Sequence, residues 1–207
     1  QLALAYKGDA LANMGLYDEA IETLNQALSH MHTGSKEITY CTYLLGKTYY
    51  LKKDYSLSLN YLHKACSLAL TDRDMEYYNP AILCSAKIYY QLEDFKSACP
   101  LYEYVIKNGK SYSKADYDEA LQKLMLSYNR CGSFAKTLNL FDKLNSKDFT
   151  QELYLILSLY RADALKGMNK NMDAYQAYCQ VLECDYEYLA VIALKKAYIL
   201  SSEKNIG

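Results

Sequence analysis

The sequence contains few of the residues that break helices. Its 207 residues include 2 prolines and 8 glycines, and tryptophan is absent. Proline removes a backbone donor and clashes with the preceding helical turn, while glycine weakens a helix interior by about 1 kcal/mol relative to alanine. A chain of this length with so few breakers is therefore predicted to be all-helical.

The sequence also lacks an excess of either charge and any long apolar run. It has 23 Lys+Arg against 24 Asp+Glu, a net charge of −1. A protein that binds nucleic acid through bulk electrostatics would show a clear basic excess, so we expect no nucleic-acid partner. The longest near-apolar stretch, 153–160, is far shorter than the ~20 residues of a membrane-spanning helix, so no membrane span is predicted. The 51% hydrophobic content excludes a disordered chain.

Seven cysteines are scattered along the chain, without a C-x-x-C spacing. An odd count without paired spacing indicates reduced thiols, and therefore an intracellular protein of the cytoplasm, with the nucleus as the alternative. Gln1 begins inside a helical pattern without an initiating Met, and Gly207 directly follows another helical pattern. We expect the chain to be a piece of a longer protein.

Motifs for catalysis or metal binding are also missing. His30 and His32 are two residues apart and would point to different faces of a helix. His63 and Cys66 could share a helix face, but no second pair accompanies them. The sequence contains no G-x-S-x-G, no P-loop and no dinucleotide fingerprint. We therefore expect a non-enzymatic protein with no catalytic residue, no metal site and no cofactor.

Small, turn-forming and aromatic residues recur in one order, in five copies along the chain. The first copy runs from Gly8 through Gly15, Tyr17, Ala20 and Leu24 to Ala27. The other four copies place matching residues in the same order: Gly46, Tyr49, Tyr55, Leu62 and Ala65; Ala86, Tyr89, Phe95, Ala98 and Tyr102; Met125, Tyr128, Gly132, Phe134, Phe141 and Leu144; and Ala162, Leu165, Ala174, Tyr178 and Leu182.

This pattern resembles the tetratricopeptide repeat (TPR) superfamily. The resemblance implies an all-α fold, a right-handed superhelical solenoid of antiparallel helix pairs, here as a single array over residues 1–207. The repeats are expected at about 1–34, 39–72, 79–112, 118–151 and 155–187, followed by a terminal helix at 188–204. The copies are 38, 40, 39 and about 37 residues apart, a long-period variety compared with the standard ~34.

The long period has consequences for local structure. The extra residues fall between repeats, so the helices are expected to be about one turn longer than usual. A tight turn between the two helices of each repeat is expected at Gly15, Lys53-Asp54, Glu93-Asp94, Gly132-Ser133 and Asn169–Asn171. Pro100 falls inside the second helix of the third repeat and is expected to kink that helix or shift its start.

In TPR proteins the first helix of each repeat lines a concave groove that binds partners. The resemblance implies these groove residues: Tyr6, Asp9, Asn13, Tyr40, Tyr43, Lys47, Tyr50, Lys87, Tyr90, Lys123, Asn129, Arg130 and Tyr160. Tyrosines, amides and cations suit a protein or peptide partner with an acidic or amide-rich segment. Alternatively, some of the tyrosines pack against neighbouring helices, and the lysines form a solvated face.

The clamp that some TPR co-chaperones use for the C-terminal carboxylate of heat-shock proteins is not expected here. Its five positions are occupied by Ala5, Asp9, Leu44, Pro80 and Cys84, none of which matches. The leading hypothesis is a non-enzymatic protein–protein interaction scaffold that holds a peptide or a partner helix in the concave groove. Two alternatives stay open: a regulatory TPR segment of a signalling or transcriptional regulator, and a structural subunit of a large assembly that self-associates through its terminal repeats.

Overall fold

The computed structural model describes residues 1–31, 36–72 and 75–203, and these ranges contain eleven α-helices and no strand. The prediction of an all-α fold is therefore confirmed. The chain divides into two compact units, Gln1–Tyr112, called unit 1, and Ser113–Gly207, called unit 2.

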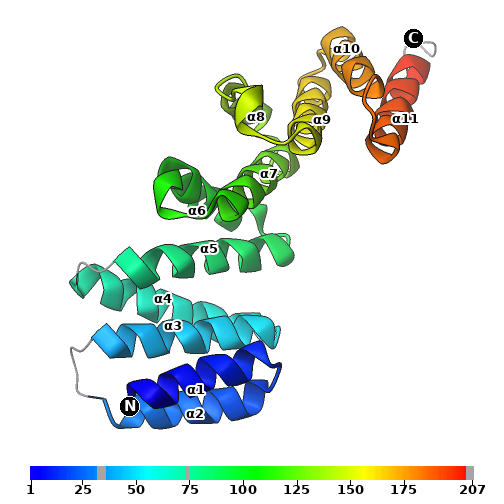
Figure 1. Cartoon of the computed structure of the whole chain (residues 1–207). Helices are drawn as coiled ribbons and strands as arrows, with labels where there is room; N and C mark the ends of the chain where they lie inside the picture. The colour runs from blue at the N-terminus through cyan, green and yellow to red at the C-terminus, as the bar shows by residue number, and fades with distance from the viewer. Residues whose placement is uncertain (32–35, 73–74, 204–207) are drawn as a thin grey trace. The chain divides into compact units, whose positions relative to one another are not determined.

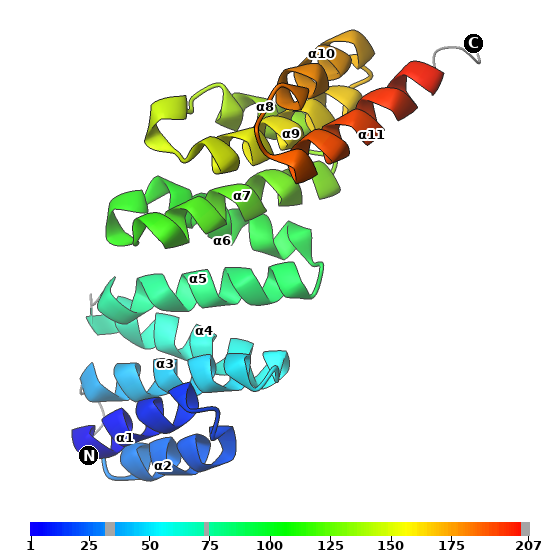
Figure 2. The ribbon, with the colours of Figure 1, turned by 45° about the vertical axis from the view of Figure 1, so that its right-hand side comes forward.

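Unit 1 is a stack of antiparallel helix pairs (Figures 1 and 2). Each pair packs against the next, and the first helices of the pairs, α1, α3 and α5, lie side by side. The elements are α1 (Leu2–Asn13), α2 (Tyr17–Ser29), α3 (Lys36–Leu51), α4 (Tyr55–Asp72), α5 (Met75–Gln91), α6 (Phe95–Lys107) and a 3-10 turn at Gly109–Ser111.

In unit 2 long first helices alternate with shorter second helices. The long helices α7 and α9 pack against each other, and α11 packs against both α9 and α10. The elements are α7 (Lys114–Arg130), α8 (Phe134–Phe141), a 3-10 turn at Ser146–Asp148, α9 (Gln151–Gly167), α10 (Asn171–Leu182) and α11 (Glu187–Glu203). The core of this unit gathers Leu159 and Leu165 of α9, Val181 of α10 and Leu189 of α11.

Left-handed backbone closes the turn inside each predicted repeat. The residues with positive φ between helices are Gly15, Lys53, Glu93, Gly132 and Asn169, with φ between 57° and 82°. In every case the second helix begins two residues later. The five predicted turn sites are thus confirmed, and their spacing of 38, 40, 39 and 37 residues repeats the long period read from the sequence.

The extra residues of the long period extend the first helices at their N-terminal ends. The helices α3, α5, α7 and α9 begin three or four residues ahead of the expected repeat starts at 39, 79, 118 and 155. The predicted lengthening by about one turn is confirmed for these helices, which span 16 or 17 residues. A 3-10 turn also precedes the extended helix between α6 and α7 and between α8 and α9.

The two helices of a pair approach most closely where their small residues meet. A Cβ added to Gly46 on α3 would lie 2.8 Å from Leu62 Cγ on α4. At the same crossing the Ser58 hydroxyl donates to the Gly46 carbonyl at 2.7 Å. Both Gly46 and Ser58 are buried. The small residues of the repeat pattern therefore set the distance between paired helices, as ridge-and-groove packing requires.

Pro100 does not shift the start of its helix. Helix α6 begins at Phe95, two residues after the left-handed Glu93, and continues through Pro100 to Lys107. The side chain of Asp94 accepts a hydrogen bond from the Ser97 amide and caps the helix at its expected place. Pro100 lies on the exposed side, where water can hydrogen-bond to the carbonyl that has lost its donor.

Helix α11 corresponds to the predicted terminal helix, with bounds shifted by one residue. It carries apolar side chains on opposite sides. Leu189, Ala193, Ala197 and Leu200 are buried in the core of unit 2. Its other side exposes Tyr188, Val191, Ile192, Leu194, Tyr198 and Ile199. Self-association through the terminal repeats stays a prediction.

Candidate functional site

Four tyrosines from the first helices of three successive pairs form a continuous surface on unit 1, the tyrosine surface. Tyr6 lies on α1, Tyr40 and Tyr43 lie on α3, and Tyr77 lies on α5. The ring centroids are 5.8 Å apart for Tyr6 and Tyr40, 5.1 Å for Tyr40 and Tyr77, and 6.1 Å for Tyr43 and Tyr77. Because Tyr40 and Tyr43 are three residues apart, they share one face of α3.

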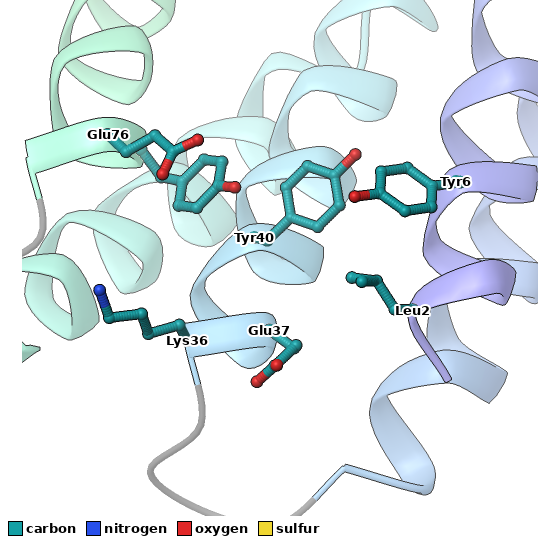
Figure 3. A pocket seen from close by; sticks show the side chains of 7 residues that line it. Leu2, Tyr6, Lys36, Glu37, Tyr40 and Glu76 are labelled. Atoms are coloured by element: carbon teal, nitrogen blue, oxygen red, sulfur yellow. The ribbon is translucent and has the colours of Figure 1, made fainter.

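The tyrosine surface borders a hollow of about 180 Å³ (Figure 3). Leu2, Tyr6, Tyr40 and Tyr77 supply its apolar walls, and its charged rim comes from the first turns of α3 and α5, with Lys36, Glu37 and Glu76. Tyr6 is 58% exposed, whereas the other three tyrosines are half-buried. Burial, followed by the charge of Asp9, raises the pKa of Tyr40, so its hydroxyl stays protonated and can donate a hydrogen bond.

Lys47, a predicted groove cation, has its charge balanced inside unit 1. Its ammonium lies 2.9 Å from the Asp9 carboxylate and 3.4 Å from the Asn13 amide oxygen, so three predicted residues meet across α1 and α3. The charges of Lys87 and Lys47 also act on the Cys84 thiol of α5, where they oppose the larger effect of burial on its pKa. The Lys47 ammonium and the Asp9 carboxylate therefore neutralise each other.

The buried thiols of unit 1 give a pH-dependent prediction. Burial raises the pKa of Cys41 and Cys66 to about 11 and that of Cys84 to about 12, from an ordinary value of 9.0. Because the folded state favours the protonated thiol, these groups leave the free energy of unfolding unchanged below pH 9 and lower it as the pH rises toward 11.

The same burial predicts slow chemical labelling of these cysteines. At about pH 8, where the thiolate is the reactive form, iodoacetamide should label them far more slowly in the folded protein than in denaturant. Peptide mass spectrometry measures both rates, and equal rates would contradict the prediction.

Two other predicted groove tyrosines pack against the second helix of their own pair. The Tyr50 ring lies 6.2 Å from that of Tyr55 on α4. The Tyr90 ring lies edge-on to Phe95 and Tyr102 of α6, at 5.7 Å and 6.4 Å. The packing of Tyr50 and Tyr90 therefore matches the alternative that some tyrosines serve the interface between helices.

The predicted residues of unit 2 divide between a hollow and separate contacts. Asn129, Arg130 and Tyr160 line one open hollow of about 600 Å³ between α7, α9 and α11. Lys123 lies outside the lining and forms an ion pair with Glu119, one turn earlier on α7, at 2.8 Å. Tyr160 is held by a side-chain hydrogen bond with Gln122, and burial raises its pKa.

Asn129 connects three helices of unit 2. Its amide nitrogen donates to the Tyr160 carbonyl on α9 at 2.7 Å, and its amide oxygen accepts from the Thr137 hydroxyl on α8, also at 2.7 Å. Both hydrogen-bonding groups of the side chain are therefore used inside the protein. Asn129, a predicted binding residue, therefore connects the helices around the hollow.

Sequence reasoning missed several residues that line these two surfaces. In unit 1 they are Leu2, Lys36, Glu37, Glu76 and Tyr77. Most of them precede the expected repeat starts at 39 and 79, on the extra N-terminal turns of α3 and α5. The long period of the repeat was the sequence signal for these residues, because it predicted longer helices. It did not indicate whether the extra turn would be added at the N-terminal or the C-terminal end. In unit 2 the missed residues include Phe134 and Lys196, from a second helix and from the terminal helix.

Two other kinds of site are missing from the part of the chain that the structure describes. Over residues 1–31, 36–72 and 75–203, no three His, Cys, Asp or Glu side chains come together as a metal site would require. Within the same ranges, none of the helices combines the length and the apolar character needed to span a membrane. All seven cysteines are free thiols.

Comparison with solved structures defines the class of fold. The chain is similar to nearly identical TPR-like repeats of a Podosopora anserina protein assigned as a kinesin light chain, with 15% identity, a TM-score of 0.65, and coverage of 86% of this chain and 92% of that chain. It is also similar to MamA of AMB-1, with 15% identity, a TM-score of 0.61, and coverage of 87% and 96%. The chain therefore has the tetratricopeptide-repeat fold, and the resemblance read from the sequence is confirmed at the level of the fold. No family model and no curated protein sequence matches it.

Proposed function

We propose that the chain is a non-enzymatic protein-interaction module that holds an extended peptide or a partner helix on the first helices of its pairs, with the tyrosine surface of unit 1 as the main contact. The observation that carries the proposal is the meeting of Tyr6, Tyr40, Tyr43 and Tyr77 in one surface beside a hollow. Tyrosine is enriched among the residues that dominate binding energy at interfaces, because it combines a large apolar ring with a hydroxyl and loses little conformational entropy.

The chemistry of the rim favours a particular partner for this surface. Glu37 and Glu76 place two carboxylates around the tyrosines, against one cation, Lys36. An amide-rich segment can donate hydrogen bonds to carboxylate and phenol oxygens, and its apolar neighbours can cover the rings. We therefore propose a protein partner with amide and apolar side chains at the tyrosine surface. The free thiols of all seven cysteines support a reducing, intracellular compartment such as the cytoplasm or nucleus.

Peptide selection on the full chain tests this proposal. A phage-displayed library of random dodecapeptides is selected on the protein, and the enriched peptides are synthesised and titrated by calorimetry. Tyr6→Ala combined with Tyr40→Ala should weaken binding about tenfold or more, because loss of interface tyrosines often costs over 1 kcal/mol each.

The matched control removes two exposed tyrosines elsewhere, Tyr175 on α10 and Tyr198 on α11. Tyr175→Ala combined with Tyr198→Ala should leave the affinity within about twofold of the original, since neither ring belongs to the tyrosine surface. Circular dichroism confirms that both double variants are folded. Equal binding by the Tyr6/Tyr40 variant and the unmodified chain would contradict the proposal.

A further inference from the structure

The hollow of unit 2 differs from the tyrosine surface in its charge. It has a volume of about 600 Å³, within the range of ~300–1,000 Å³ that ligand sites occupy. Three cationic side chains and one carboxylate line it: Arg130, Lys166, Lys196 and Asp163. Its lining therefore carries a formal excess of two positive charges in a chain whose net charge is −1.

The single carboxylate in the hollow already has its partners. The Lys196 ammonium of α11 lies 2.5 Å and 2.6 Å from the two Asp163 carboxylate oxygens, and the Tyr178 hydroxyl of α10 donates to the same group at 2.6 Å. Burial and the bonded Asp163 carboxylate raise the pKa of Tyr178, so this phenol stays a donor. Arg130 and Lys166 are the other two cationic side chains of the lining, so its formal charge stays positive.

One wall of the same hollow is apolar and fixed in place. Phe134, Leu126 and Tyr160 supply this wall. A side chain at Gly167 would overlap the Phe134 ring, so the absence of a Cβ allows the ring to lie directly against α9. Asn129 joins α7 to α8 and α9 through its two hydrogen bonds. The hollow is thus preorganised, which reduces the entropy that a ligand must lose on binding.

We propose that the hollow of unit 2 binds an acidic segment of a protein partner. Arg130 and Lys166 receive a carboxylate, with the planar Arg130 guanidinium suited to a two-pronged hydrogen bond. An apolar side chain next to that carboxylate packs on Phe134, Leu126 and Tyr160. This site is independent of the tyrosine surface, because it lies in the other unit and selects for opposite chemistry.

A subtractive peptide selection tests the assignment. The random dodecapeptide library is selected in parallel on the unmodified full chain and on a variant with Arg130→Gln and Lys166→Gln. Peptides rich in Asp and Glu beside an apolar residue should be enriched only on the unmodified chain. Peptides held by the tyrosine surface should be enriched on both, so the two sites succeed or fail separately. For the best acidic peptide, the variant should bind about tenfold or more weakly, and replacement of its acids by amides should weaken binding similarly.

The control variant removes the same number of positive charges from a part of unit 2 outside the hollow. Lys143 and Lys147 are exposed residues of unit 2 that do not line it, so Lys143→Gln combined with Lys147→Gln alters the net charge by the same amount. This control should retain both the enrichment and the affinity. The proposal is overturned if no acidic peptide is enriched on the unmodified chain, if both double variants weaken binding equally, or if a phosphopeptide or a single-stranded oligonucleotide binds the hollow more tightly than the acidic peptide.

Discussion

Replacement of Gly46 by valine is expected to lower the free energy of unfolding by about 3 kcal/mol, the upper part of the range for overpacked cores. The added Cβ would lie 2.8 Å from Leu62 Cγ and Cδ2, and 3.1 Å from the Leu62 backbone nitrogen. A side chain can rotate away from a clash, but the backbone of α4 can only move by separating the two helices. The hydrogen bond from Ser58 to the Gly46 carbonyl opposes that separation. Urea denaturation followed by circular dichroism measures the change.

A double-mutant cycle identifies the cause of this loss. Leu62→Ala removes the two side-chain atoms that the new Cβ would meet, at the cost of a cavity in the core of unit 1. Combined with Gly46→Val it should destabilise by clearly less than the sum of the two single changes, with a coupling of about 1 kcal/mol or more. Additive effects would mean that the clash with Leu62 is not what limits this position.

Loss of the Asn129 side chain is expected to cost about 2–3 kcal/mol of stability, because two hydrogen bonds between helices disappear together. The Thr137 hydroxyl, which is fully buried, would be left with only a long 3.5 Å contact to the Met125 carbonyl. The Tyr160 carbonyl on α9 would also lose the Asn129 amide as a donor. Asn129→Ala should therefore shift the urea midpoint downward, whether or not any partner is present.

The control for Asn129 is another asparagine on the adjacent helix. Asn139 is exposed on α8, and Asn139→Ala should change the free energy of unfolding by no more than about 0.5 kcal/mol, as surface substitutions usually do. An equally small effect of Asn129→Ala on the free energy of unfolding, together with weaker peptide binding, would contradict the structural role. It would support the predicted role of Asn129 in binding a partner.

The architecture could be predicted from the sequence because closely packed helix pairs require small residues where the two backbones approach. Gly46 and Ser58 are small because two backbones approach there, and the left-handed turns fall where Gly15 and Gly132 mark them. These features depend on the residue's own size and backbone freedom. They can therefore be recognised from the residue type and its spacing alone.

The candidate site was less predictable because it depends on where helices begin and on which way side chains point. Tyr77 belongs to the tyrosine surface only because α5 starts at Met75, four residues ahead of the expected repeat. Lys47 and Asn129 lie on the expected helices, yet the Lys47 charge pairs with Asp9 and the Asn129 amide donates to the Tyr160 carbonyl. Pairing between helices that are 30 to 40 residues apart is not visible in a local pattern.

The five left-handed turns show that this fold accepts different residue types at one backbone geometry. One backbone geometry is occupied by glycine twice and by lysine, glutamate and asparagine once each. A non-glycine residue in this conformation costs roughly 1–2 kcal/mol, a cost that the packed helices on either side must offset. Since the helices rather than the turn residue impose the geometry, the turn can change its amino acid and keep its shape.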